Sequence, residues 1–185
     1  MELLKKTISH DEKKKQDNSD KKKLLADDRH PKSAEHYKEE WSFIEFVPAK
    51  ENIAYQLQYL EYMINLYNDY QMYLTIESLH CKNIMITITS IMECALYDLL
   101  YQLARKKSDI GFDEKEDFFR MIDLGFQKGL LDGQMKNLLH ELRKVRNFIH
   151  ISNLEHKEYE AYNIEQVNSY IMLLDNYKNR VKGRV

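Results

Sequence analysis

The sequence predicts an all-α fold, an antiparallel bundle of about five helices. Glycine and proline are rare, with five and two in 185 residues, and beyond about residue 40 the apolar residues recur at helical spacing. The chain is 43% hydrophobic, which suffices for one core of ordinary size. We therefore expect one helical domain whose short loops make neighbouring helices antiparallel.

The N-terminal part of the chain differs in composition from the rest. Residues 1–40 contain two runs of three lysines, several aspartates and few large apolar residues, so they cannot bury enough surface to offset their conformational entropy. We expect a flexible charged tail over residues 1–40 and a helical domain over residues 41–185. The net charge is −2, so no overall positive field indicates nucleic-acid binding, and any such binding has to be local.

The first two expected helices are long. One runs from about Pro48, which suits a first turn, to about Leu74. The next runs from about Glu77 to about Arg105. Its β-branched segment "ITIT" at 86–89 favours a strand by propensity alone, but the apolar run around it is too long for a strand and lacks flanking turns, so we predict helix.

The apolar run at 84–104 is long enough to raise the question of a membrane span. Glu93 and Asp98 lie inside it, and an acidic residue near the centre of a span costs roughly 2.5 to 3.5 kcal/mol. A buried core helix is the better interpretation, and no membrane association is expected. The only cysteines, Cys81 and Cys94, are interpreted as reduced thiols of a cytoplasmic protein.

Three shorter helices follow. The third is expected to end at Gly129, Asp132 is placed to cap the fourth, and the fifth is expected over about 159–181. The fourth helix carries an apolar stripe that should anchor it to the core: Leu138, Leu142, Val145 and Ile149.

Polar residues gather on one flank of this fourth helix. Four of them lie at about 65° to 165° from the centre of the stripe: Arg146, His150, Arg143 and Asn147. An arginine offers a permanently charged fork for a phosphate, and a histidine can exchange a proton near neutral pH. Together they supply what phosphodiester cleavage without a metal requires. Alternatively, these side chains only complement the C-terminal end of a helix dipole and help the chain to turn.

Two residues of the second helix could support such a site. Glu93 and Ser90 could line the same cleft, and Glu93 could pair with an arginine of the fourth helix, although a purely structural ion pair is equally consistent with the sequence. His80, Cys81 and His140 lack the spacing of a multi-ligand site, so we predict no metal and no other cofactor.

The segment "GLLDGQMKNLLHELRKVRNFIH", with "SIMECALYDLL" upstream, resembles the HEPN superfamily of helical bundles. Members of that family carry an Arg and a His near the end of a late helix, usually with Asn directly after the Arg, and here Arg146, Asn147 and His150 match this pattern. The resemblance implies a homodimer whose two motifs face one cleft. It also implies either a metal-independent endoribonuclease of a toxin–antitoxin, abortive-infection (phage defence) or RNA-processing system, or a non-catalytic module that binds RNA or a protein.

The match departs from the usual pattern in its spacing. Arg146 and His150 have three residues between them, fewer than the family generally places there, whereas Arg143 and His150 have six. Either Arg143 takes the role of the leading arginine, or the close pair is a variant, or activity has been lost. If the site is active, the resemblance implies that His150 moves a proton at the ribose 2′-hydroxyl or the leaving 5′-oxygen. Arg146 and Arg143 would then neutralise the phosphorane while Asn147 orients a phosphate or the histidine. RNA and a cognate antitoxin or other protein are the implied partners.

Overall fold

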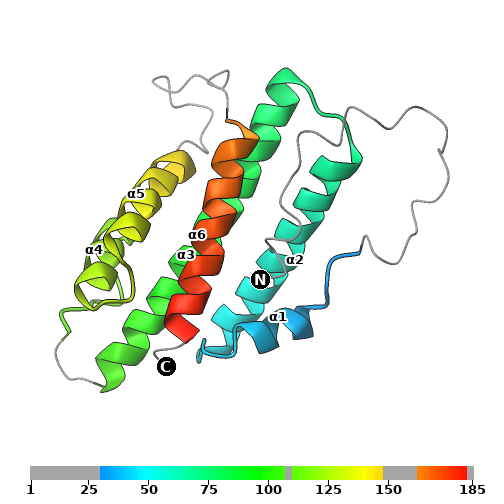
Figure 1. Ribbon diagram of the computed structural model, residues 1–185. Helices are drawn as coiled ribbons and strands as arrows, with labels where there is room; N and C mark the ends of the chain where they lie inside the picture. Colours follow the sequence, from blue (N-terminus) through cyan, green and yellow to red (C-terminus); the bar gives the residue numbers. More distant parts are fainter. Residues whose placement is uncertain (1–29, 107–109, 148–161, 183–185) are drawn as a thin grey trace.

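The computed structural model describes residues 30–106, 110–147 and 162–182, and all regular secondary structure within these ranges is helical. The all-α prediction is therefore confirmed for the described residues. Figure 1 shows the six helices found there. They are α1 (Ala34–Glu40), α2 (Val47–Asp69), α3 (Leu74–Lys106), α4 (Phe118–Gln127), α5 (Gly133–Asn147) and α6 (Ile164–Lys182).

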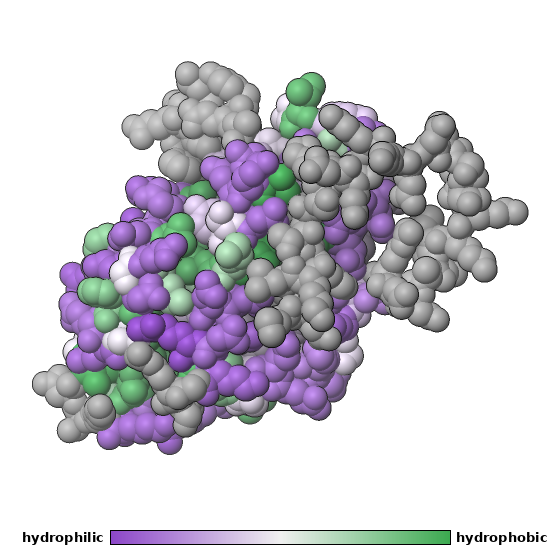
Figure 2. Space-filling view, in the orientation of Figure 1, coloured by the Kyte–Doolittle hydropathy of each residue, from purple (hydrophilic) through white to green (hydrophobic). Residues whose placement is uncertain are grey.

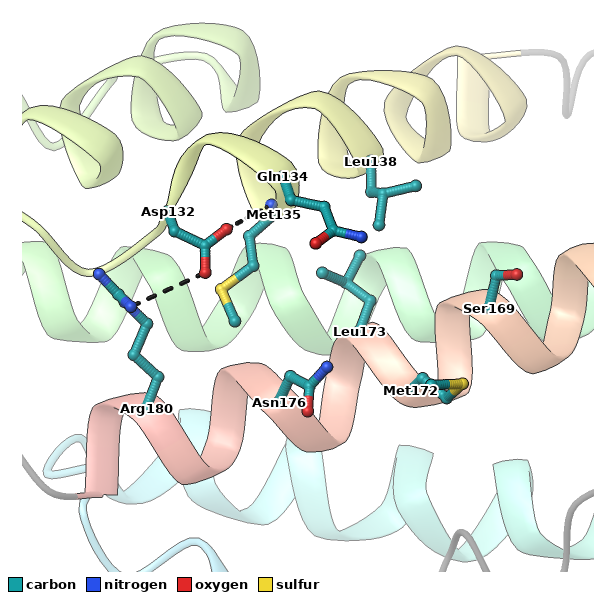
Figure 3. Close-up of a pocket in the computed structure, with 9 residues that line it drawn as sticks. All are labelled: Asp132, Gln134, Met135, Leu138, Ser169, Met172, Leu173, Asn176 and Arg180. Atoms are coloured by element: carbon teal, nitrogen blue, oxygen red, sulfur yellow. Dashed lines mark hydrogen bonds and ion pairs between the residues drawn. The ribbon is translucent and has the colours of Figure 1, made fainter.

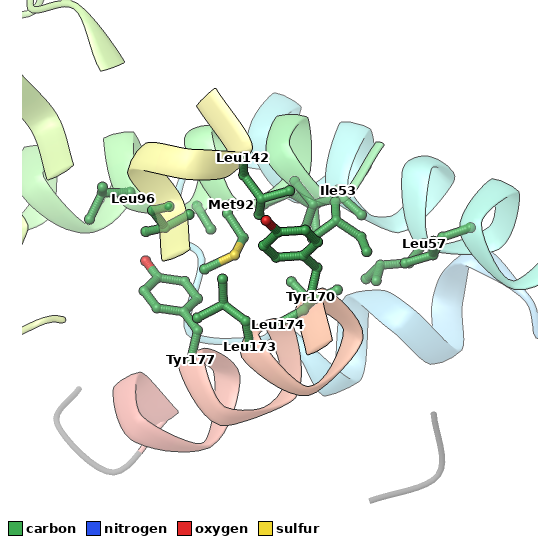
Figure 4. Close-up of a cluster of buried hydrophobic side chains, with 14 of the residues drawn as sticks. Ile53, Leu57, Met92, Leu96, Leu142, Tyr170, Leu173, Leu174 and Tyr177 are labelled. Atoms are coloured by element: carbon green, nitrogen blue, oxygen red, sulfur yellow. The ribbon is translucent and has the colours of Figure 1, made fainter. Parts of the chain in front are cut away.

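Helix α3 lies at the centre of the fold. It packs against α2 on one side and against α4 and α5 on the other, while α6 runs along it and also contacts α5. Figure 4 shows the core that these helices share, to which Ile53 of α2, Met92 of α3, Leu142 of α5 and Leu174 of α6 each contribute a buried side chain. Helix α5 is thereby held against α3, and this packing sets which side chains of the two helices face each other.

The segment 86–89 is helical, as predicted, and lies within α3. Its threonine hydroxyls are satisfied inside the helix, because Thr87 donates to the carbonyl of Asn83 at 3.0 Å and Thr89 donates to that of Met85 at 2.7 Å. Helix α3 is also the one described helix that is long and apolar enough to cross a membrane, and 67% of its most apolar window is buried within the fold. Length and composition alone distinguish poorly between a span and the core helix of a packed domain.

The folded region begins earlier than residue 41. Helix α1 lies within the expected tail, and it buries Tyr37 and, just after its end, Trp41 against α2. The side chain of Ser33 caps this helix by accepting a hydrogen bond from the backbone of His36 at 3.2 Å. The tail prediction is therefore wrong for residues 34–40, because two large aromatic side chains suffice to anchor a short helix.

Several helix ends follow local signals, and two do not. Pro48 lies in the first turn of α2, Gly129 with its positive φ of 78° follows α4, and the side chain of Asp132 caps α5, all as predicted. The first long helix ends at Asp69 and not near Leu74, because the chain must reverse there for α2 and α3 to bury their facing apolar stripes. The last helix begins at residue 164 and not near residue 159.

Candidate functional site on helices α3 and α5

The buried face of α5 is rotated from the one that the sequence predicts. Met135, Leu139 and Leu142 are buried, whereas the expected anchors Leu138 and Val145 are only half-buried. At 100° per residue, this is a rotation of about 60°. The fourth expected anchor, Ile149, lies outside the described residues.

This rotation changes the position of Arg146. The buried residues 135, 139 and 142 are followed at the same helical spacing by Arg146, which therefore continues the buried stripe and does not flank it. A guanidinium in such a position requires a partner on the facing helix. That partner is Glu93 of α3.

Arg146 and Glu93 form an ion pair between α5 and α3. The Nη2 atom of Arg146 lies 3.1 Å from Oε2 of Glu93, and the two side chains are 38% and 24% exposed. The sequence left this pairing open, and the structure contains it. The pair lies where the packed core meets the surface, so a ligand can reach the guanidinium without breaking the ion pair.

Glu93 is the titratable group of the pair. Burial raises the pKa of its carboxyl above the ordinary value of 4.5, and the positive charge of Arg146 opposes this rise without cancelling it. A carboxyl group with a raised pKa exchanges its proton more readily near neutral pH than an exposed glutamate does. The pair therefore places a guanidinium that can hold an anion beside a carboxyl whose pKa burial raises.

Ser90 lies one turn before Glu93 on α3, on the same face. Its hydroxyl donates a hydrogen bond to the carbonyl of Ile86 at 3.0 Å. The donor capacity of the hydroxyl is thereby used within the helix, while its oxygen retains acceptor capacity. Ser90 therefore lies one turn from Glu93 with its hydroxyl donor already used within α3.

Arg143 points to a different helix from Arg146. Its guanidinium lies over the ring of Phe119 in α4, with 5.1 Å between the guanidinium carbon and the ring centroid. Within the part of the chain that the structure describes, Arg143 forms no ion pair and no hydrogen bond through Nε. The two arginines therefore contact different partners among the described residues, and their joint action on a phosphate stays a prediction.

The remaining predicted residues lie at or beyond the end of α5. Asn147 is its last residue and is exposed. His150 lies outside the described residues, so the predicted arginine–histidine pair is not placed. Glu93 and Arg146 are thus the predicted site residues that the structure brings into direct contact.

A second polar cluster, between α4 and α5, was not predicted. Oδ1 of Asp123 lies 2.7 Å from Nζ of Lys136 and 3.4 Å from Nε2 of His140, and the ring of His140 packs on that of Phe119 with centroids 4.9 Å apart. The hydrogen bond from Lys136 is the main cause that lowers the pKa of Asp123. The sequence signal was the spacing of Lys136, His140 and Arg143, which places all three on one face of α5.

No group of three or more His, Cys, Asp or Glu residues in the described ranges is arranged to hold a metal ion.

A pocket in the described part of the chain lies elsewhere on α5. It is an open groove of about 500 Å³ between the first half of α5 and α6, and Figure 3 shows its lining side chains. Asp132 and Arg180 lie 3.7 Å apart at one end of it, so their charges offset each other. Arg146 and Glu93 are not among its lining residues.

Comparison of the chain with models of known protein families, with curated proteins and with solved structures finds no match.

Proposed function

We propose that this chain is a HEPN-like, metal-independent endoribonuclease, cytoplasmic and homodimeric, that acts in a toxin–antitoxin or phage-defence system. The observation that carries the proposal is the ion pair of Arg146 with Glu93, a carboxyl whose pKa is raised by burial. The all-helical fold and the position of Arg146 at the end of α5 agree with the resemblance of the segment that ends in His150.

The guanidinium of Arg146 can serve Glu93 and a phosphate together. It has five N–H donors, and the ion pair with Glu93 involves one Nη2 atom. The donors on its other edge are then available to a phosphoryl oxygen, which a planar fork binds bidentately. Glu93 would hold the guanidinium in position, so no side-chain entropy is lost when the phosphate binds.

The chemistry divides among the predicted residues. His150 would take the proton from a ribose 2′-hydroxyl, the oxygen would attack the adjacent phosphorus, and the 5′-oxygen would leave with a proton from a second acid. His150 of the other subunit would act as that acid, while Glu93 stays paired with Arg146. Arg146 would neutralise the pentacoordinate phosphorane, and Asn147 would orient the phosphate or the histidine.

The test is cleavage of an RNA with single-stranded and base-paired regions by the purified chain in EDTA. Arg146→Ala and His150→Ala should each lower the cleavage rate by roughly a hundredfold or more. The products of the wild-type chain should end in a 2′,3′-cyclic phosphate, and a 2′-deoxynucleotide at the scissile position should block cleavage. Arg105→Ala, at an exposed arginine near the end of α3, is the matched control and should retain the wild-type rate. Unchanged cleavage in both site variants would refute the assignment.

A second candidate is a non-catalytic HEPN-like module that binds RNA or a protein partner. The observation that favours it is that the guanidinium of Arg146 is already paired while that of Arg143 lies on an aromatic ring, an arrangement that also serves packing. This candidate predicts a folded wild-type chain that binds RNA and does not cleave it. The same samples decide between the two candidates when binding is measured beside cleavage.

A further inference from the structure

Helices α4 and α5 present two facing rows of side chains at the surface, which we call the α4–α5 seam. Residues at i, i+4 and i+7 form each row, so that each row follows one face of its helix. The seam consists of Phe119, Asp123 and Phe126 on α4 and Lys136, His140 and Arg143 on α5.

Aromatic rings and cations meet at both ends of the seam. Arg143 lies 5.1 Å from the ring centroid of Phe119, and Nζ of Lys136 lies 5.2 Å from that of Phe126. The two phenylalanines are also 45% and 42% exposed, although both are large apolar residues. Figure 2 shows hydrophobic surface interspersed among hydrophilic surface on the side of the molecule that α4 and α5 form. The rings are therefore partly open to a ligand.

The seam is locally basic on a chain whose net charge is −2. Residues 118–147 contain six Lys and Arg residues against three Asp and Glu residues. Asp123 pairs with Lys136 and contacts His140, whereas Arg143 has no acidic partner among the described residues. The end of the seam at Arg143 thus carries the least compensated positive charge, and an anionic ligand would be attracted there.

We propose that the α4–α5 seam binds single-stranded RNA, with unstacked bases on Phe119 and Phe126 and phosphates at Arg143 and Lys136. Exposed rings beside cations fit both parts of a nucleotide, because every base has a π face and every linkage carries a charge. A regular duplex keeps its bases stacked on one another, so it has no free base to stack on the two phenylalanine rings. An acidic peptide would use the cations and leave the rings without a partner.

The seam leads to the candidate site. Arg143 lies one turn before Arg146 and Asn147 on α5, so a strand that follows the seam reaches the end of that helix. The inference rests on the proposed function in that it takes RNA as the ligand. It adds where the substrate strand lies and predicts a preference for unpaired RNA.

The test is the affinity of the full-length chain for a fluorescent single-stranded 2′-fluoro-RNA of mixed sequence, which lacks the attacking hydroxyl. The double variant Phe119→Leu, Phe126→Leu keeps apolar bulk and removes the rings, and its affinity should fall about twenty-five-fold or more, since each stacked base contributes roughly fivefold or more. The matched control is Tyr59→Leu, Tyr62→Leu, which removes an equally exposed, stacked pair of rings from α2. This control should bind as the wild type does.

The charge contribution is tested by salt dependence. Arg143→Gln should weaken binding and lower the slope of log affinity against log salt by about 0.7, the value for one phosphate contact on a single strand. Lys106→Gln, at an exposed lysine of α3, should leave the slope unchanged. Thermal unfolding of each variant identifies any loss that comes from a defect in folding.

The outcomes separate this inference from the proposed function. Wild-type affinity in the phenylalanine double variant, or equal competition by polyglutamate and by duplex RNA, would overturn the seam assignment while cleavage at Arg146 and His150 could still stand. Binding that depends on the seam without any cleavage would support the seam and refute the nuclease.

Discussion

The carboxylate of Asp98, within α3, accepts a hydrogen bond from the backbone N–H of Phe46 at 2.9 Å, directly before α2. It also accepts one from the N–H of Glu45 at 3.1 Å. The residue at the N-cap of α2 is Phe46 itself, whose side chain forms no capping hydrogen bond. A side chain of the central helix thus satisfies the two backbone N–H groups that directly precede α2, and so fixes the start of that helix against α3.

Asp98→Ala should lower the free energy of unfolding by about 1 to 3 kcal/mol, because it removes the acceptor of two part-buried backbone hydrogen bonds. Asp98→Asn should cost less, since an amide oxygen can still accept one of these bonds. Urea unfolding measures both changes. Glu114→Ala, at an exposed acid, is the control, and a loss for Asp98→Ala no greater than for this control would show that the cap contributes little.

Elements with strong local signals could be predicted from the sequence. Gly129 ends α4 and Asp132 caps α5 because turn and cap geometry depend on a few neighbouring residues. The length and the apolar content of the run around residues 86–89 predicted a helix despite the β-branched segment, and α3 is helical there. Helix α1 carries a similar signal, a capping Ser33 before Tyr37 and Trp41, but the lysine-rich residues before it obscured it.

The orientation of α5 could not be predicted in the same way. Leu138 and Val145 are as apolar as Met135 and Leu139, so the sequence alone allows two buried faces about 60° apart. The packing of α3 and α6 selects one of them, and it brings Arg146 to the buried side. The sequence therefore allowed the contact of Arg146 with Glu93, but it did not predict that Arg146 faces α3 while Arg143 faces α4.

Glu93 should lower the free energy of unfolding as the pH rises, whereas most carboxyl groups have the opposite effect. Because burial raises the pKa of Glu93 in the folded chain, the native state binds a proton there more tightly than the unfolded state does. The contribution of this group to stability is therefore present below the unfolded value of 4.5 and is lost as the pH rises through the folded pKa. Urea unfolding between pH 4 and 7 measures this effect. The free energy of unfolding of the wild type minus that of Glu93→Gln should decrease as the pH rises.

Asp123→Asn supplies the control of opposite sign. The hydrogen bond from Lys136 lowers the pKa of Asp123, so its contribution is present above the unfolded value of 3.8 and is lost as the pH falls through the folded pKa. The free energy of unfolding of the wild type minus that of Asp123→Asn should then decrease as the pH falls. Slopes of the same sign in the two variants would mean that the environment of at least one of the two carboxyls is not as described.

Gly133→Ala should stabilise the chain by about 0.4 to 1 kcal/mol. Gly133 is the first residue of α5, and a Cβ atom there would meet no atom within 4 Å. Alanine restricts the unfolded chain and suits the helix, so the change acts chiefly through the lost entropy of the unfolded state. Thermal and urea unfolding should agree on the gain.

Gly125→Ala, in α4, should have the opposite effect despite the same gain in helix propensity. A Cβ atom there would lie 2.8 Å from Cδ1 of Leu96 and 3.3 Å from Cδ1 of Leu131, and both leucines are buried. Overpacking of this kind costs about 1 to 3 kcal/mol, more than alanine gains in a helix. A gain at Gly125 equal to that at Gly133 would contradict the close packing of α4 on α3.

Tyr177→Phe should leave the free energy of unfolding unchanged or raise it. Tyr177 is fully buried on α6, and Figure 4 shows it in the core. Its hydroxyl has no hydrogen-bond partner among the described residues, and burial raises its pKa. Folding therefore removes this hydroxyl from water without giving it a hydrogen bond in return. Tyr67→Phe is the matched control, because the hydroxyl of Tyr67 donates to the carboxylate of Glu77, and its removal should cost about 0.5 to 1.5 kcal/mol. A similar loss in both variants would show that the hydroxyl of Tyr177 is bound in solution, since only a satisfied hydroxyl stabilises a core.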